Sequence, residues 1–351
     1  MSYQITVADT DITFPCEAAQ TVLDAAETAG WSIPYSCRKG VCTTCAGGLR
    51  TGELTVRGNG TVRGPQHDVL LCRAVPCTDV EITPKRIASR RPPVRKTITA
   101  TVYRIRRPTR RITLLDLRFP IGLRAPFRAG QYLTVLLPDG DSRLYSMANS
   151  PQHNDGAQLH VRTEPGGRFS DTTLATLATG DTLTVELPYG EFSLDPDSDE
   201  PVIFLATGTG FAPIKSIIED QIARRSDRTI HLYWGARDEA DLYWGDLAAH
   251  WARQQPWFRF TPVLSRPTRT WNGATGWVQH AVLHDHPDLR GHQVYACGSQ
   301  QMTTEALTHF NSTAELTEDR FHSDAFVPSG DPVAPPSATA DRTQWSKHDR
   351  R

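Results

Sequence analysis

The feature that most constrains this chain is a group of cysteines near its N-terminus. The segment YSCRKGVCTTC places three of them at C-x4-C-x2-C spacing, and a fourth follows in LLCRA. A single loop can wrap an inorganic cluster so that three thiolates converge, while a separate segment supplies the fourth. Because a 2Fe–2S cluster needs two thiolates on each iron, the spacing predicts such a cluster. Its expected ligands are Cys37, Cys42, Cys45 and Cys72.

Two other interpretations of these thiols are a structural zinc site and a set of unrelated buried cysteines. Zinc sites usually have C-x2-C pairs on both sides, and this sequence has one such pair. Cys16 and Cys77 lie outside the spacing, and we expect them to be small apolar residues of the core. The odd total of seven cysteines does not indicate a disulfide framework.

The overall composition argues against several classes of partner. Lysine plus arginine (38) nearly equals aspartate plus glutamate (39), which argues against a nucleic-acid-binding surface over the whole protein. No run of about 18 apolar residues occurs, so we expect no membrane-spanning helix. The start, MSYQITVADTDITF, lacks a basic segment followed by an apolar one. We therefore expect a cytoplasmic protein. We also expect it to act as a monomer.

The 351 residues are enough for two or three domains, and the first of them is small. In residues 1–84, β-type runs flank TVLDAAETAG, a short helix that Thr21 is expected to cap. Together with the cysteine spacing, this module resembles a plant-type 2Fe–2S ferredoxin domain. That resemblance implies a β-grasp fold.

Two segments are expected to lie outside the folded modules. Residues 85–96 are basic and rich in proline, which predicts a linker. A solvated linker is the simpler interpretation, and guidance of an acidic partner is the alternative. The basic residues in question are Arg90, Arg91, Arg95 and Lys96. Residues 327–351 contain four prolines, few apolar residues and many charges, which predicts a disordered tail.

Residues 97–196 consist of short β-branched runs separated by Gly, Pro and Asp, which predicts an antiparallel β-barrel. One helical segment is expected over 170–178, with Ser170 as its N-cap. In the segment RLYS, Arg143 and Tyr145 would point to one face of a strand and Leu144 to the other. An aromatic ring beside a cation suits a flavin and its diphosphate, and the alternative is an ordinary surface strand.

The order of three motifs, R-x-Y-S, then G-G-x-F-S, then PYGEF, resembles the ferredoxin–NADP reductase superfamily. In that family the first motif binds the isoalloxazine ring and the second meets the FAD diphosphate. The resemblance assigns FAD-binding roles to Arg143, Tyr145, Ser146, Gly167, Phe169 and Ser170. His160 and Arg162 are further candidates, and each could equally be a solvated strand residue.

From residue 197 to residue 326, buried strands alternate with helices, which predicts a parallel α/β sheet. The turn GTGFAP suits a dinucleotide diphosphate at a helix N-terminus. It lacks the third glycine of G-x-G-x-x-G, so a Rossmann dehydrogenase is the poorer interpretation. The reductase superfamily uses this version of the turn. It implies NADH or NADPH contacts at Thr207, Gly208, Thr209, Gly210 and Pro213.

Two later segments extend the resemblance. In YACGSQQM, Cys297 and Gly298 correspond to a turn beside the nicotinamide C4, although a buried core thiol is the alternative for Cys297. In SDAF, Asp324 and Phe326 resemble a C-terminal acidic-x-aromatic element whose ring covers the flavin. The family implies that Ser146, Cys297 and Asp324 are the catalytic residues.

The sequence leaves the choice between NADH and NADPH open. The family places the adenosine 2′ position near VLSRP and the end of the GAR strand, which here contain Ser265, Arg266 and Arg237. The two arginines could pair with a 2′-phosphate or face solvent. Reductases with this domain order mostly use NADH, whereas Arg266 favours NADPH.

The domain order resembles the reductase components of bacterial ring-hydroxylating dioxygenases and multicomponent monooxygenases. A hydride carries two electrons and an iron–sulfur cluster takes one at a time, so a flavin is expected between them. We therefore expect an enzyme that supplies single electrons to a terminal oxygenase in the degradation of aromatic compounds, through a small, transient contact. The end RFHSDAFVPS also resembles reductases of CDP-6-deoxy-hexulose chemistry, which makes a dehydrase the alternative partner. An oxygenase and a non-enzymatic electron carrier are the remaining alternatives, and the absence of Rieske C-x-H pairs disfavours the first.

Overall fold

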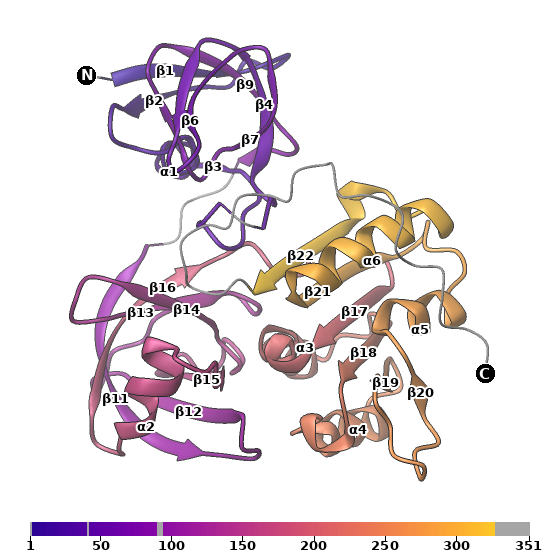
Figure 1. Cartoon of the computed structure of the whole chain (residues 1–351). Helices are drawn as coiled ribbons and strands as arrows, with labels where there is room; N and C mark the ends of the chain where they lie inside the picture. Colours follow the sequence, from indigo (N-terminus) through magenta and orange to yellow (C-terminus); the bar gives the residue numbers. More distant parts are fainter. Residues whose placement is uncertain (1, 41, 90–93, 327–351) are drawn as a thin grey trace.

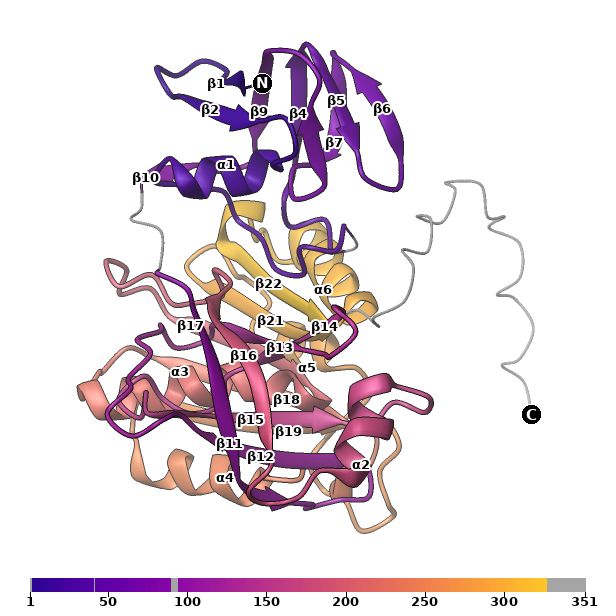
Figure 2. The same ribbon diagram turned by 90° about the vertical axis from the view of Figure 1, so that its left-hand side faces the viewer.

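The computed structural model describes residues 2–40, 42–89 and 94–326, which form three parts in chain order. Figures 1 and 2 show the N-terminal part above a barrel and a parallel sheet that lie next to each other. The loop with the cysteines extends from the N-terminal part toward the other two parts. Within these described ranges, no helix is long and apolar enough to cross a membrane.

The N-terminal part is a mixed β-sheet with one helix. Its elements are β1 (Ser2–Val7), β2 (Thr13–Glu17), α1 (Val22–Thr28), β3 (Trp31–Ser32), β4 (Ala46–Thr51), β5 (Glu53–Val56), β6 (Gly60–Arg63), β7 (Gln66–Leu70), β8 (Ala74–Pro76) and β9 (Val80–Pro84). The main sheet has the order β2-β1-β9-β4-β7, in which β1 and β9 run parallel. Helix α1 buries Val22, Leu23 and Ala26 in the core, and the Thr21 hydroxyl accepts the Asp24 N–H as the predicted N-cap. The β-grasp prediction is confirmed.

The second part is an antiparallel sheet that closes on itself. Its strands are β11 (Lys96–Arg106), β12 (Ile112–Arg118), β13 (Tyr132–Leu136), β14 (Ser142–Ser146), β15 (Gly156–Arg162) and β16 (Thr182–Tyr189). The order is β14-β13-β16-β11-β12-β15, and a bridge between Met147 and Leu159 joins the two edges. Along β11, Ile98, Ala100 and Val102 are buried and alternate with exposed residues, as a barrel wall requires.

The helical segment of the barrel differs from its prediction. It consists of a π-helical turn, Arg168–Thr173, and the short helix α2 (Leu174–Thr176). The expectation that Ser170 caps this segment was wrong, because the turn begins directly after Gly167. Ser170 lies inside the turn, where its Oγ accepts a hydrogen bond from the Glu164 N–H at 3.2 Å. The Asp171 carboxylate instead accepts a backbone N–H of the preceding glycine pair at 2.8 Å, which fixes the start of the turn.

The third part is a parallel sheet covered by helices on both faces. It consists of β17 (Val202–Thr207), α3 (Phe211–Arg224), β18 (Ile230–Ala236), α4 (Gly245–Gln254), β19 (Phe258–Leu264), β20 (Ala274–Thr275), α5 (Val278–Asp285), β21 (Gln293–Ser299), α6 (Gln300–Thr313) and β22 (Phe321–Phe326). The order is β20-β19-β18-β17-β21-β22. Phe204 packs in the core that includes α3 and α4 residues, and its neighbour Leu205 packs in the core that includes α5 and α6 residues. Burial on both faces explains the continuous apolar runs of these strands.

The connection between the first two parts is more ordered than its composition predicts. A two-residue strand, β10 (Ala88–Ser89), pairs with β3 at the edge of the N-terminal part. The interpretation of a solvated linker is wrong for Arg95, which forms an ion pair with Glu27 and keeps only 28% of its side chain exposed. Lys96 begins β11 and donates to the Arg124 carbonyl at 2.9 Å. Arg90, Arg91 and the predicted tail, 327–351, lie outside the described residues.

The barrel also contributes side chains to the core of the N-terminal part. Tyr132 of β13 is 4% exposed and belongs to that core, and Leu144 and Tyr189 pack against it. The Tyr132 hydroxyl donates to the Ser36 carbonyl at 3.0 Å, directly before the first cysteine of the loop. Apolar packing and hydrogen bonds therefore both hold the cysteine loop against the barrel.

Candidate cofactor-binding site

The four cysteines of the motif lie together as two close pairs. The Cys37 N–H donates to the Cys42 sulfur at 3.5 Å, and the Cys42 N–H donates to the Cys37 sulfur at 3.4 Å. A hydrogen bond between the other two thiols lowers the pKa of Cys45 and raises the pKa of Cys72. Two thiol pairs with backbone N–H groups directed at a sulfur are the donor set that a binuclear cluster uses, with two thiolates on each iron. The residues present therefore fit a 2Fe–2S cluster.

The two remaining cysteines of this part were expected to be small apolar residues of the core, and only Cys16 is fully buried. Cys16 is fully buried in the core, and burial raises the pKa of its thiol to about 11. Cys77 is partly exposed, and its sulfur lies 3.2 Å from the Thr55 hydroxyl. Both lie in strands or turns away from the cysteine loop.

The strand that carries RLYS presents an aromatic ring and a cation beside this loop. Tyr145 packs on Phe169, with ring centroids 5.3 Å apart, while Leu144 points to the core of the N-terminal part. Arg143 is 9% exposed, and its guanidinium lies 2.6 Å from the Asp141 carboxylate. The opposite orientations of Leu144 and Tyr145 are those expected of a strand.

A second arginine, which was not among the residues predicted from the sequence, lies beside Arg143. Arg168 begins the π-helical turn and approaches the same Asp141 oxygen at 3.3 Å. Next to it, a Cβ added to Gly166 would meet no atom within 4 Å, so the turn borders open space. Two guanidinium groups beside an open glycine turn suit an anionic diphosphate, so the residues fit FAD. The G-G-R order in the sequence is the signal that could have indicated Arg168.

The two other flavin candidates of β15 have different surroundings. His160 is 4% exposed, its Nδ1 lies 2.8 Å from the Tyr243 hydroxyl, and its ring contacts Trp244. Burial, reinforced by the charge of Lys215, lowers the pKa of His160, so this ring is neutral and packs between the barrel and the third part. Arg162 is exposed, and its Nη1 lies 3.8 Å from the position of a Cβ added to Gly208. Arg162 thus reaches the glycine turn of the third part.

The glycine turn and the Cys-Gly turn pack directly against each other. A Cβ added to Gly210 would lie 2.0 Å from the Cys297 carbonyl oxygen, and one added to Gly298 would lie 2.0 Å from the Thr207 hydroxyl. Thr209 is buried beside them, and Pro213 lies in the first turn of α3, as predicted. Only glycine allows this approach, so the two motifs form one surface at the carboxyl edge of the sheet, where nucleotides bind in such folds.

The three residues expected to be catalytic lie where all three parts meet. Asp324 of β22 pairs in register with Cys297 of β21, and the side chain of Ser146 at the end of β14 lies close enough to its carboxylate to lower its pKa. The carboxylate accepts a hydrogen bond from Ser36 in the cysteine loop. Burial raises the pKa of Asp324 to about 6 and raises the pKa of the Cys297 thiol well above its ordinary value. Phe326 follows at the end of β22 and is 37% exposed.

The residues expected near the adenosine 2′ position also lie together. The Arg266 N–H donates to the Arg237 carbonyl at 2.8 Å, and the Ser265 N–H donates to the Ala236 carbonyl at 3.0 Å. All three predicted residues are exposed and follow the carboxyl ends of β18 and β19. Two exposed guanidinium groups at this edge fit a phosphate on the nucleotide.

Three protein-family descriptions match the chain, one for each part. The 2Fe-2S iron-sulfur cluster binding domain matches residues 5–77. The oxidoreductase FAD-binding domain matches residues 109–194, and the oxidoreductase NAD-binding domain matches residues 204–307. The matches follow the order of the three parts in the structure.

Similarity to individual proteins extends over almost the whole chain. Reductase component 1 of terephthalate 1,2-dioxygenase from Comamonas sp is 42% identical, over 94% of this chain and 98% of the relative. The CDP-6-deoxy-L-threo-D-glycero-4-hexulose-3-dehydrase reductase of Yersinia pseudotuberculosis is 36% identical, over 94% of this chain and all of the relative. The crystal structure of the Amycolatopsis cytochrome P450 reductase GcoB superposes with a TM-score of 0.76 at 30% identity, covering 93% of this chain and all of that one.

Proposed function

The chain belongs to the ferredoxin–NADP reductase superfamily, to the reductases that join 2Fe–2S, FAD-binding and NAD-binding domains, and we propose that its electrons go to a terminal oxygenase. The proposed oxygenase acts on an aromatic compound. This proposal is supported by the 42% identity to a terephthalate dioxygenase reductase component over nearly the full length of both chains. The proposal also divides the chain into five segments. They are the ferredoxin domain (1–84), the linker (85–96), the FAD-binding barrel (97–196), the NAD(P)H-binding domain (197–326) and the tail (327–351).

One observation carries the proposed path of electrons within the chain. Asp324 accepts a hydrogen bond from Ser36, which directly precedes the cluster ligand Cys37, and the side chain of Ser146 lies near the same carboxylate. The site proposed for the nicotinamide and the cysteine loop are therefore linked through one side chain. When bound, FAD supplies the chemistry that converts a hydride, with its two electrons, into single electrons for a 2Fe–2S cluster.

The residues of this chain have distinct proposed roles around these groups. Ser146 is assigned to the hydride-accepting edge of the flavin, and Cys297 and Asp324 to positioning of the nicotinamide. The cluster ligands are Cys37, Cys42, Cys45 and Cys72. The proposed FAD contacts are Arg143, Tyr145, Gly167, Phe169 and Ser170, with His160 and Arg162 as further residues of the same strand. The proposed nucleotide contacts are Thr207, Gly208, Thr209, Gly210, Pro213, Gly298 and Phe326, with Arg237, Ser265 and Arg266 at the adenosine 2′ position.

We place this reductase in the cytoplasm and propose that it acts as a monomer. A cluster held by four thiols suits a reducing compartment.

A second candidate partner is a CDP-6-deoxy-hexulose dehydrase. The observation that favours it is the 36% identity to a reductase of that system, over the entire length of the relative. The two candidates differ in the protein that receives the electrons and share all the cofactor assignments.

The test of this proposal uses the purified full-length chain with NADH and with NADPH, and ferricyanide or cytochrome c as acceptor. We expect rapid reduction with at least one nucleotide, and the absence of turnover with both would contradict the reductase assignment. Supplying the chain to a purified aromatic-ring oxygenase and to a dehydrase then identifies the partner. Hydroxylated product from the first supports our proposal, and product from the dehydrase alone would replace it with the second candidate.

A further inference from the structure

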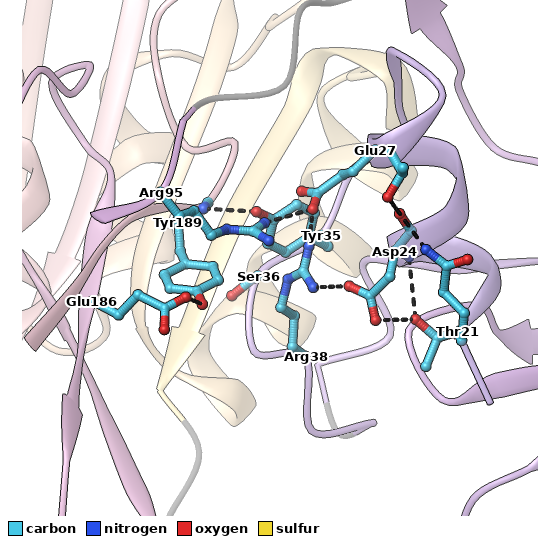
Figure 3. A network of polar contacts seen from close by, with 12 residues as sticks. Thr21, Asp24, Glu27, Tyr35, Ser36, Arg38, Arg95, Glu186 and Tyr189 are labelled. Atoms are coloured by element: carbon cyan, nitrogen blue, oxygen red, sulfur yellow. Dashed lines mark hydrogen bonds and ion pairs between the residues drawn. The ribbon is translucent and has the colours of Figure 1, made fainter. Parts of the chain in front are cut away.

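Glu27, near the C-terminal end of α1, binds two arginines that belong to different segments of the chain. Its Oε2 lies 2.6 Å from Nη2 of Arg38 and 2.5 Å from Nη2 of Arg95. Arg38 follows the cluster ligand Cys37 directly, whereas Arg95 stands one residue before the first strand of the barrel. Figure 3 shows the three side chains converging from these directions. One carboxylate therefore connects the cysteine loop to the segment that enters the barrel.

The ion pairs of Glu27 are shielded from solvent. The exposed fractions of the side chains are 11% for Glu27, 19% for Arg38 and 28% for Arg95. Exposed ion pairs contribute little because water screens them, whereas the Glu27 carboxylate is buried between two guanidinium groups. It accepts a charge-assisted hydrogen bond from Arg95 and forms an ion pair with Arg38. Removing the carboxylate leaves two neighbouring positive charges without their shared partner, and such removal is strongly destabilising.

Aromatic rings from both parts extend the contact across the interface. The Arg95 guanidinium lies 4.2 Å from the ring centre of Tyr189 in β16, and the Arg38 guanidinium lies 4.2 Å from that of Tyr35. Tyr189 stacks on Tyr132 with ring centres 5.6 Å apart. The Gly190 N–H donates to the Tyr35 hydroxyl at 3.1 Å, which is a direct hydrogen bond from the barrel to the cysteine loop.

The backbone of the loop is consistent with a fixed position for Arg38. Its φ angle is +51°, a left-handed conformation that residues other than glycine seldom adopt. Such a conformation persists where the surroundings hold it, and here Asp24 and Glu27 of α1 both bind the Arg38 guanidinium. Cys37, its neighbour, is 6% exposed and directly follows Ser36, which donates to Asp324.

We propose that Glu27 is a positioning residue that docks the cysteine loop on the barrel by holding Arg38 and Arg95 together. The docked loop keeps Cys37 beside the site built on Ser146 and Asp324. The expected effect on electron transfer to the cluster rests on the proposed function. The docking of the loop on the barrel does not depend on that function. Neither Glu27 nor Arg95 belongs to the assigned cofactor contacts.

The first test compares Glu27→Gln with Glu53→Gln in the full-length, cluster-loaded protein. Glu53 forms an ion pair with Arg63 at 2.8 Å on a hairpin whose strand partners all belong to the same part, so it is the matched control. Hydrogen–deuterium exchange at the peptide containing Gly190 reports docking, because this N–H is bonded across the interface. In Glu27→Gln we expect the exchange rate of this peptide to be at least about ten times the wild-type rate. In Glu53→Gln we expect the wild-type rate.

The second readout is anaerobic stopped-flow reduction by the preferred nucleotide, followed at a flavin wavelength and at an iron–sulfur wavelength. In Glu27→Gln the flavin phase should keep its wild-type rate, while the iron–sulfur phase slows about tenfold or more. Wild-type exchange at Gly190 together with a wild-type iron–sulfur phase would overturn the inference. If wild-type protein shows no reduction by either nucleotide, the proposed function fails, and exchange at Gly190 still decides the docking role.

Arg95→Gln provides the same test from the other side of the ion pair. Arg95 lies outside the sheets of the N-terminal part, so this variant preserves that fold and its cysteines if Glu27→Gln fails to load iron. We expect it to reproduce faster exchange at Gly190 and the slower iron–sulfur phase, with unchanged iron content. Wild-type values for both readouts in Arg95→Gln would overturn the inference.

Discussion

Ser36 donates a hydrogen bond to Asp324, although 288 residues separate them in the sequence. Ser36 belongs to the cysteine loop, and Asp324 belongs to the last strand of the NAD-binding sheet. The side chain of Ser146 in the barrel lies near the same carboxylate. Because each residue comes from a different part, the hydride-transfer site proposed for the barrel and the NAD-binding part is closed by the cluster-binding part.

The substitution Cys42→Ser should separate the two halves of the electron path. Cys42 is one of four thiols in the proposed cluster, and its loss leaves one iron with a single cysteine ligand. We expect loss of iron, of acid-labile sulfide and of electron transfer to the natural partner, with retained ferricyanide reduction by NAD(P)H. Loss of the ferricyanide activity as well would contradict the assignment of that activity to the flavin.

Gly210→Ala should damage the NAD-binding part even though it adds only a methyl group. The new Cβ would lie 2.0 Å from the Cys297 carbonyl oxygen, so backbone must move, at a cost of about 1–3 kcal/mol. We expect a lower Tm and a raised KM for the nucleotide. Gly291→Ala is the control, since a Cβ there meets no atom within 4 Å and no change is expected.

The folds of the three parts, and the residues that lie together in each site, could be predicted from local sequence motifs. The cysteine spacing, the glycine turn at Gly210 and the Thr21 cap each depend on neighbours within a few positions, and the structure shows each of these local features. The start of the helical turn was mispredicted because Ser170 is a good N-cap by type, while the glycine pair before it lets the chain turn earlier.

Contacts between distant segments could not be predicted in this way. Glu27 and Arg95 belong to residue types that usually face solvent, and nothing in the sequence around them indicates that they meet. Tyr132 looks like an ordinary strand residue, yet it belongs to the core of another part. Such contacts depend on how the folded parts pack, which local periodicity does not encode.

Arg266→Ala should raise KM for NADPH without raising KM for NADH. If Arg266 pairs with a 2′-phosphate, its loss removes a charge-assisted hydrogen bond that NADH never makes, so KM for NADPH should rise about tenfold. KM for NADH should stay within about twofold of the wild-type value. Arg269→Ala, a nearby exposed arginine, is the control, and equal changes for both nucleotides would refute the assignment.

The stability of the third part should depend on His231 at acidic pH. Burial, the neighbouring His286 and Arg259 outweigh the opposite effect of Asp285 and lower the pKa of His231 from 6.5 to about 4. As pH falls from 6.5 toward 4, the unfolded chain binds a proton at this residue and the folded chain does not, so the free energy of unfolding decreases. This contribution is complete above pH 6.5.

The measurement is Tm at pH 7 and at pH 5 for His231→Gln and for His250→Gln, an exposed residue of α4. We expect a smaller loss of Tm on acidification in His231→Gln than in the wild type, and the wild-type loss in His250→Gln. An undiminished loss in His231→Gln would show that other groups account for the acid sensitivity.

In the proposed function, one chain takes a hydride from NAD(P)H and holds its electrons on two connected centres. An anaerobic titration of the purified, cofactor-loaded protein with NADH, or with NADPH if that is preferred, tests it most directly. We expect uptake of about three electrons per chain, two by the flavin and one by the cluster, complete at about 1.5 equivalents of nucleotide. Uptake of about two electrons, with the iron–sulfur absorbance unchanged, would contradict the claim.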